Sequence, residues 1–102
     1  MSQTVGMMRT VVVLRDHGCI APKLDPEAGP CYDRWGQPLS HPLDVDIDYV
    51  ERGALGPRHV LALDHVSLCA GHHRGMGPQR GRVWAKESGR RDELRAYLDS
   101  LP

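Results

Sequence analysis

One short stretch, residues 68–73, most constrains how this chain can fold. It runs Leu-Cys-Ala-Gly-His-His, so Cys69 and His72 stand three positions apart and a second imidazole follows at His73. A thiolate and an imidazole at this spacing can both reach one tetrahedral metal ion. The stretch therefore predicts one half of a metal site, with one histidine left over.

The composition indicates that such a site is needed. A chain of 102 residues with five aromatic side chains, no Phe, eleven Gly and eight Pro forms one domain with a small core. Its three cysteines cannot all pair as disulfides, and no secretory signal or membrane-length apolar run is evident. We expect a soluble, cytoplasmic protein that does not enter the membrane and whose fold is stabilised by a metal ion.

The other two cysteines, Cys19 and Cys31, complete a set of four ligands. Three thiolates and one imidazole form a closed, structural zinc site, here Cys19, Cys31, Cys69 and His72. Pro and Gly between the first two cysteines predict an irregular loop that can close at modest entropic cost. Two alternatives remain: buried, unligated cysteines, or a disulfide between Cys19 and Cys31 with Cys69 free. Zinc is favoured because the sequence offers no other feature that would stabilise so small a core, and an iron–sulfur cluster is disfavoured because a fourth Cys is lacking.

Short elements are expected along the chain. Residues 1–8 are a predicted flexible leader, and β-branched residues favour a strand at 9–14, although the next residues could equally end a short helix. Alternation predicts a strand at 43–50, and an apolar run predicts a second at 59–63. A short helix should begin near Cys69 and stop before Pro78, and a short strand is possible at 82–85. An amphipathic C-terminal helix is predicted by four side chains at helical spacing: Leu94, Tyr97, Leu98 and Leu101. Four side chains are expected in the core: Trp84, Leu94, Tyr97 and Leu98.

Charge is balanced overall but unevenly distributed. Residues 1–51 carry four basic and eight acidic side chains, residues 52–91 carry eight and two, and residues 92–102 carry one and three. The basic surplus surrounds the Cys69–His73 stretch and favours a polyanion partner. The predicted DNA-binding residues are Arg74, Arg80, Arg82 and Lys86, although these cations could instead be a solvated loop.

Five segments together resemble the HNH nuclease family, especially the small HNH proteins encoded by phages of actinobacteria. The matching segments are residues 15–19, 29–36, 45–50, 63–73 and 83–98. The resemblance implies a small α+β domain over residues 9–102. Its fold would be a zinc-stabilised ββα-metal fold, with two strands and a helix around one divalent ion, followed by a C-terminal helix.

The resemblance also implies roles for single residues. Asp48 and His73 would bind a catalytic Mg²⁺, Mn²⁺ or Ni²⁺ ion, and Asp64 stands at the position of the family's Asn. Tyr49 stands where the family has its general-base histidine, and a phenol is mostly protonated at neutral pH. His65 is a second candidate base, as are His59 and His41. The implied activity is hydrolysis of DNA phosphodiester bonds, with a role near genome packaging beside a phage terminase.

Each of these residues also has a purely structural interpretation. Tyr49 continues the apolar face of Val45 and Ile47, so its ring could be buried in the core. Alternating acidic residues before it could be the solvated face of a strand, and a calcium loop is excluded because Tyr49 and Leu55 occupy its Gly and Glu positions. His73 could be a surface side chain. A degenerate HNH module that binds nucleic acid or a protein without cutting is the alternative function.

Overall fold

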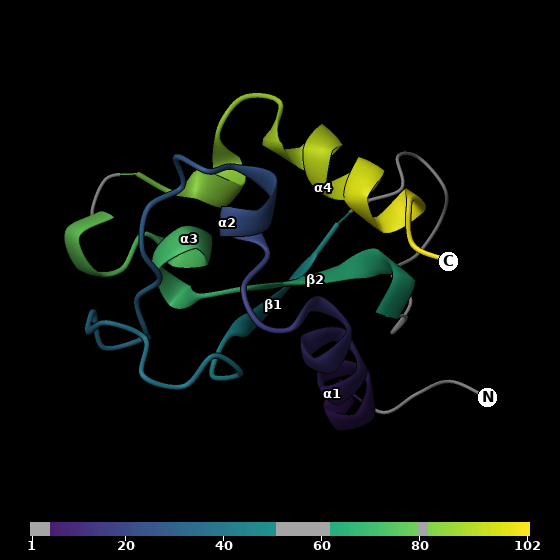
Figure 1. Ribbon diagram of the computed structural model, residues 1–102, viewed down its shortest axis with the longest axis horizontal. Coiled ribbons are helices and arrows are strands. Elements are labelled where there is room, and N and C mark those ends of the chain that lie inside the picture. Colours follow the sequence, from purple (N-terminus) through teal and green to yellow (C-terminus); the bar gives the residue numbers. More distant parts are fainter. Residues whose placement is uncertain (1–4, 51–61, 80–81) are drawn as a thin grey trace.

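A computed structural model describes residues 5–50, 62–79 and 82–102 (Figure 1). At its centre, β1 (Asp46–Tyr49) and β2 (His65–Leu68) form an antiparallel pair. Asp46 lies opposite Leu68, and Tyr49 lies opposite His65. The helical elements are α1 (Val5–Asp16), α2 (Ala21–Leu24), η1 (Ala62–Asp64), α3 (Ala70–Arg74), η2 (Gly77–Gln79), η3 (Trp84–Lys86) and α4 (Arg90–Asp99).

The strand pair lies between two layers of helix. Helix α1 lies on one side, and α3 and α4 lie on the other (Figure 1). Successive strand residues point to opposite faces. The side chains of Asp46 and Asp48 meet α3 and α4, whereas the α1 side includes Val13 packed with Val45. The result is a small α+β globule built on a two-stranded sheet.

Helix α1 corrects the prediction for the N-terminal segment. Residues 9–14 form part of a helix instead of a strand, and the helix begins at Val5, inside the predicted leader. Its buried residues are Met8, Val12, Val13 and Asp16, which lie on one face of a helix. Strand preference of β-branched residues depends on context, and burial of this face against the sheet decides for a helix.

Other element predictions hold in part. The strand expected at 43–50 is confined to Asp46–Tyr49. Of the strand expected at 59–63, residues 59–61 lie outside the described part and residues 62 and 63 belong to η1; the next described strand is His65–Leu68. The segment 82–85 leads into the 3-10 helix η3 rather than a strand. One helical turn, α2, forms between Cys19 and Cys31 because Pro22 sits at its start, where its missing N–H is harmless.

The C-terminal half of the core is confirmed. Trp84, Leu94 and Leu98 are buried in one cluster with β2, and Tyr97 packs against it half-buried. The short helix expected after Cys69 is present as α3, and it ends at Gly75, whose φ of 77° is in the left-handed region.

A buried carboxylate, Asp16, joins both helical layers to the sheet. Its side chain accepts hydrogen bonds from the backbone N–H of Ser67 (2.8 Å), the hydroxyl of Tyr97 (2.5 Å) and the Arg15 guanidinium (2.8 Å). Burial, together with the hydrogen bond to Asp16, raises the pKa of Tyr97 to about 12. The carboxylate therefore holds α1, β2 and α4 in one arrangement.

Candidate metal centre and the neighbouring histidine

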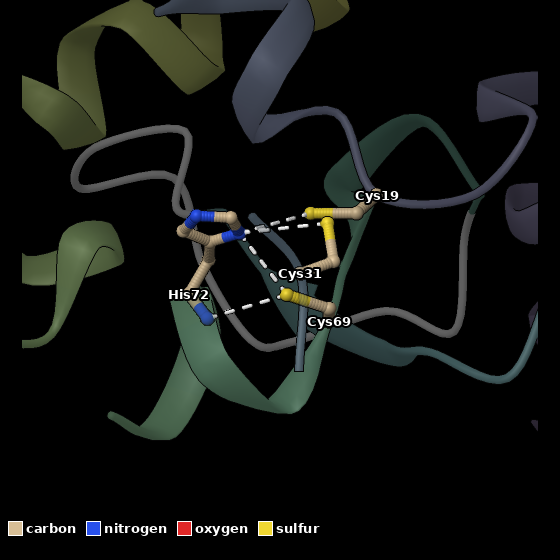
Figure 2. A group of neighbouring side chains, drawn as sticks. All are labelled: Cys19, Cys31, Cys69 and His72. Carbon is tan, nitrogen blue, oxygen red and sulfur yellow. Dashed lines mark hydrogen bonds between the residues drawn. The ribbon is translucent and has the colours of Figure 1, made fainter. Parts of the chain in front are cut away.

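Four predicted zinc ligands converge at one point (Figure 2). Nδ1 of His72 lies 3.0 Å from Sγ of Cys69, 3.5 Å from Sγ of Cys19 and 3.8 Å from Sγ of Cys31. All four ligand atoms lie within 4.8 Å of one another. Tetrahedral zinc, with bonds of about 2.3 Å to sulfur and 2.0 Å to nitrogen, separates S and N by about 3.5 Å. The cluster could therefore hold a structural zinc ion.

Local backbone geometry explains why the ligands meet. Cys69 follows β2 in an extended conformation and caps α3, where its Sγ accepts the N–H of His72 at 3.4 Å. Gly71 donates its N–H to the carbonyl of Tyr32 at 3.1 Å. A Cβ at Gly71 would lie 3.2 Å from Cβ of Tyr32, so glycine permits the close approach that brings in Cys31.

His72 is oriented for metal binding by its second nitrogen. Nε2 lies 2.9 Å from the carbonyl oxygen of Ala28, and because a carbonyl only accepts, Nε2 carries the proton and Nδ1 faces the sulfurs. Such a hydrogen bond behind a ligating histidine is typical of metal sites. Among residues 5–50, 62–79 and 82–102, this Cys3His set is the group of three or more candidate ligands that converges. The three cysteines are free thiols, so the disulfide alternative is absent.

The four clustered side chains shift one another's pKa values. Burial lowers the pKa of His72, but hydrogen bonds with Cys31 and Cys69 raise it to about 10 overall. Hydrogen bonds from Cys19 and Cys31 hold the pKa of Cys69 well below its usual range, whereas hydrogen bonds to the other two sulfurs and burial raise the pKa of Cys19. A divalent cation would displace protons from these side chains, as metal binding to thiolates and imidazoles does.

The adjacent histidine lies between two carboxylates of β1. Nδ1 of His73 is 3.0 Å from Oδ2 of Asp46, and Nε2 is 3.8 Å from Oδ1 of Asp48. Because a carboxylate accepts, Nδ1 donates to Asp46, and Nε2 faces Asp48. The structure thus brings together the two residues predicted to bind a catalytic metal, and adds Asp46 behind them.

Two arginines pair with these carboxylates. Arg74 lies 2.9 Å from Asp46, and Arg91 donates to Asp48 at 2.6 Å and to the carbonyl of Tyr49 at 2.5 Å. Together with Lys86 and His73, these arginines line a cavity of about 580 Å³ at Asp48. Sequence reasoning missed Asp46 and Arg91. Strand alternation could have placed Asp46 beside Asp48, but nothing in the sequence predicts a contact between Asp48 and Arg91, 43 positions later.

The candidate bases lie elsewhere. The rings of Tyr49 and His65 form a cross-strand contact with centroids 5.4 Å apart, and strand alternation places both on the face opposite Asp48. Asp64 is buried at the other end of the strand pair from His73, and its carboxylate lies 3.3 Å from Arg95. His41 is exposed and accepts the N–H of Leu43. The structure does not bring these residues to the Asp48–His73 pair.

Some of the remaining predicted site residues lie at the cavity beside Asp48, and others do not. His59 and Arg80 lie outside the described residues. Arg82 makes two contacts of 3.1 Å with Glu87, so its charge is already paired, whereas Lys86 lines the cavity. Arg74 is exposed beside His73 and contributes to the same cavity.

No family model, curated protein or solved structure matches the chain. The family resemblance therefore rests on the residues given above. None of the helices in the described ranges is both long and apolar enough to span a membrane.

Proposed function

We propose that the protein is a metal-dependent DNA endonuclease of the HNH type, with a ββα-metal fold braced by zinc at the Cys3His cluster. The observation that carries the proposal is the pairing of His73 with Asp48 at the edge of a cavity lined by Arg74, Lys86 and Arg91. A carboxylate from β1 and an imidazole from α3, surrounded by cations, suit a phosphodiester substrate.

The Asp48–His73 pair fits a divalent cation. Nε2 of His73 and Oδ1 of Asp48 lie 3.8 Å apart, so a small adjustment of these side chains would let both hold one divalent cation. Asp46 would fix the ring of His73 so that Nε2 faces the ion, as carboxylates behind ligating histidines do. Mg²⁺, Mn²⁺ or Ni²⁺ would supply Lewis-acid stabilisation of the phosphoryl group.

The chain's own cations would bind and orient the substrate. Arg74 and Lys86 are placed to neutralise phosphates beside the scissile bond. Arg91 would exchange its contact with Asp48 for a phosphate contact when a metal ion occupies Asp48, because two cations would then share one carboxylate. The family resemblance proposes Tyr49 or His65 as the base, but both rings lie on the face of the sheet opposite Asp48.

A second candidate function is a degenerate HNH module that binds nucleic acid or a protein without cutting. Two observations favour it. Arg91 forms an ion pair with Asp48, and the candidate bases Tyr49 and His65 pack against each other away from the site. Such a module would retain the zinc-braced fold and the cations around His73. The role in genome packaging beside a phage terminase belongs to the endonuclease prediction and rests on the family resemblance alone.

A plasmid-nicking assay separates these functions. Zinc-loaded protein is incubated with supercoiled plasmid and Mg²⁺, Mn²⁺ or Ni²⁺, beside His73→Ala, Tyr49→Phe and the matched control His41→Ala, which removes an exposed imidazole elsewhere. The endonuclease predicts nicking that His73→Ala abolishes and His41→Ala retains. Full activity of Tyr49→Phe would move the role of base to His65. Absence of nicking with every metal, together with salt-sensitive DNA retention, would favour the binding module.

A further inference from the structure

A second cavity lies on the other side of His73. It has a volume of about 530 Å³ and is lined by Arg9, Arg34, Asp46, Ile47, His73 and Arg74. His73 and Arg74 also line the cavity that contains Arg91 and Lys86, so the two cavities adjoin at the proposed active site. A strand that crosses His73 would enter both.

The second cavity is rich in positive charge. Three guanidinium groups line it against one carboxylate, Asp46, which His73 and Arg74 already contact. Arg9 donates to the neutral carbonyl of Val45, and among residues 5–50, 62–79 and 82–102 it makes no ion pair. Arg34 lies 3.4 Å from Asp44, and both side chains are well exposed, so this ion pair is weak. The cavity is therefore suited to phosphate groups.

An exposed indole stands beside this cavity. Trp35 is 67% exposed, the highest value among the large apolar side chains in the described residues, and the guanidinium of Arg34 lies 4.9 Å from its ring centroid. The turn that carries it is well defined. One oxygen of Asp33 accepts the N–H groups of Trp35 (2.9 Å) and Gln37 (3.0 Å), and Gly36 adopts a φ of 78°. The turn holds an apolar ring in water, next to cations.

We propose that Arg9, Arg34 and Trp35 form a binding subsite for an unpaired nucleotide strand. The two arginines would contact phosphates, and the Trp35 ring would stack on a base. An aromatic platform next to a basic groove is the arrangement by which proteins bind single strands without sequence preference. A duplex keeps the faces of its bases stacked inside, so it offers the indole no base to cover. The subsite rests on the proposed nuclease function, because it specifies where the bound strand leaves His73. Binding of a strand at this subsite does not require that the strand be cut.

Fluorescence titration with a short oligothymidine tests the subsite. The zinc-loaded protein is used without added Mg²⁺, Mn²⁺ or Ni²⁺, so that the oligonucleotide is not cut. Trp84 is fully buried and Trp35 is exposed, so binding should quench the solvent-exposed fraction of the emission. Because stacking of one base contributes about 1–3 kcal/mol, Trp35→Ala should raise Kd by about 5- to 150-fold. Trp35→Phe should retain most of the affinity.

A matched control removes another exposed apolar side chain. Leu63, 53% exposed in η1, lies at the far end of the strand pair from His73, so Leu63→Ala should leave Kd unchanged. Arg9→Ala and Arg34→Ala should each weaken binding and reduce the slope of log K against log salt by about 0.7. Binding of oligouridine with the same Kd would also support the subsite, since phosphates and exposed base faces are common to single-stranded DNA and RNA.

Two results would overturn the subsite. One is an unchanged Kd for Trp35→Ala, and the other is tighter binding of duplex than of single strand with no quenching of Trp35. These results are separable from failure of the proposed function. If the wild-type protein never nicks plasmid but binds oligothymidine through Trp35, the subsite stands and the nuclease fails. If nicking depends on His73 but Trp35→Ala binds normally, the nuclease stands and the subsite fails.

Discussion

Removal of zinc from the Cys3His cluster should unfold the protein. The cluster joins three segments that are distant in sequence, at Cys19, Cys31 and Cys69 with His72, and the last two residues are fully buried. At about 0.05–0.15 kcal/mol per residue, a chain of 102 residues has a total stability of about 5–15 kcal/mol. Structural zinc contributes about 10–16 kcal/mol in small domains at neutral pH. The contribution of the ion is thus comparable to the whole stability.

Circular dichroism melts with parallel zinc analysis check this prediction. Protein treated with a strong chelator and shown to be zinc-free should lose its cooperative melt and regain it when zinc is restored. Cys69→Ala should behave like the chelated protein. Ser67→Ala is the matched control: Ser67 is equally buried in β2, and among the described residues its hydroxyl has no partner, so the substitution should be neutral or slightly stabilising. A zinc-free sample that melts cooperatively near the temperature of the zinc-loaded protein would refute the reasoning.

Two further predictions concern the fold. Tyr97→Phe removes a hydrogen bond to the Asp16 carboxylate and should lower the free energy of unfolding by about 1.5–3 kcal/mol at neutral pH. Because the pKa of Tyr97 is raised to about 12 in the folded protein, the stabilisation by its hydroxyl is complete below about pH 10 and is lost as pH rises through 12. Urea denaturation should therefore show the free energies of unfolding of the wild type and Tyr97→Phe converging near pH 12. A difference that stays constant with pH would contradict the assignment. Gly18→Ala places a Cβ 2.4 Å from the carbonyl oxygen of Pro42 at a φ of 93°, and should cost about 2 kcal/mol or more; a thermal melt unchanged from that of the wild type would show that this turn can move.

The Cys69–His72 half of the metal cluster was the most predictable feature, because its two ligands are local in sequence, whereas Cys19 and Cys31 join it only through the fold. Cys69 and His72 are close in sequence, so one turn of helix is enough to bring them together. The C-terminal helix was equally clear, since Leu94 and Leu98 recur at helical spacing and are both buried. In both cases the pattern lies within one element, and tertiary context does not alter it.

Features that depend on tertiary packing were not predictable. The β-branched run in α1 favoured a strand, and only the contact of Val12 and Val13 with the interior favours a helix. The same holds for the surroundings of His73: Arg91 reaches Asp48 across 43 positions, and Arg9 and Arg34 come from the half of the chain with an acidic surplus. Local charge counts cannot place such side chains, because the fold decides which of them become neighbours.

The two adjacent histidines allow the most direct test of the account, which assigns them to different ions. Zinc content and Mn²⁺ binding, followed by plasma mass spectrometry and electron paramagnetic resonance, are measured on the wild type and on His73→Ala. We expect one zinc ion per chain in both proteins and a Mn²⁺ site that only the wild type retains. Loss of zinc from His73→Ala, or Mn²⁺ binding that is unaffected by it, would contradict the assignment of His72 to a structural ion and His73 to a catalytic one.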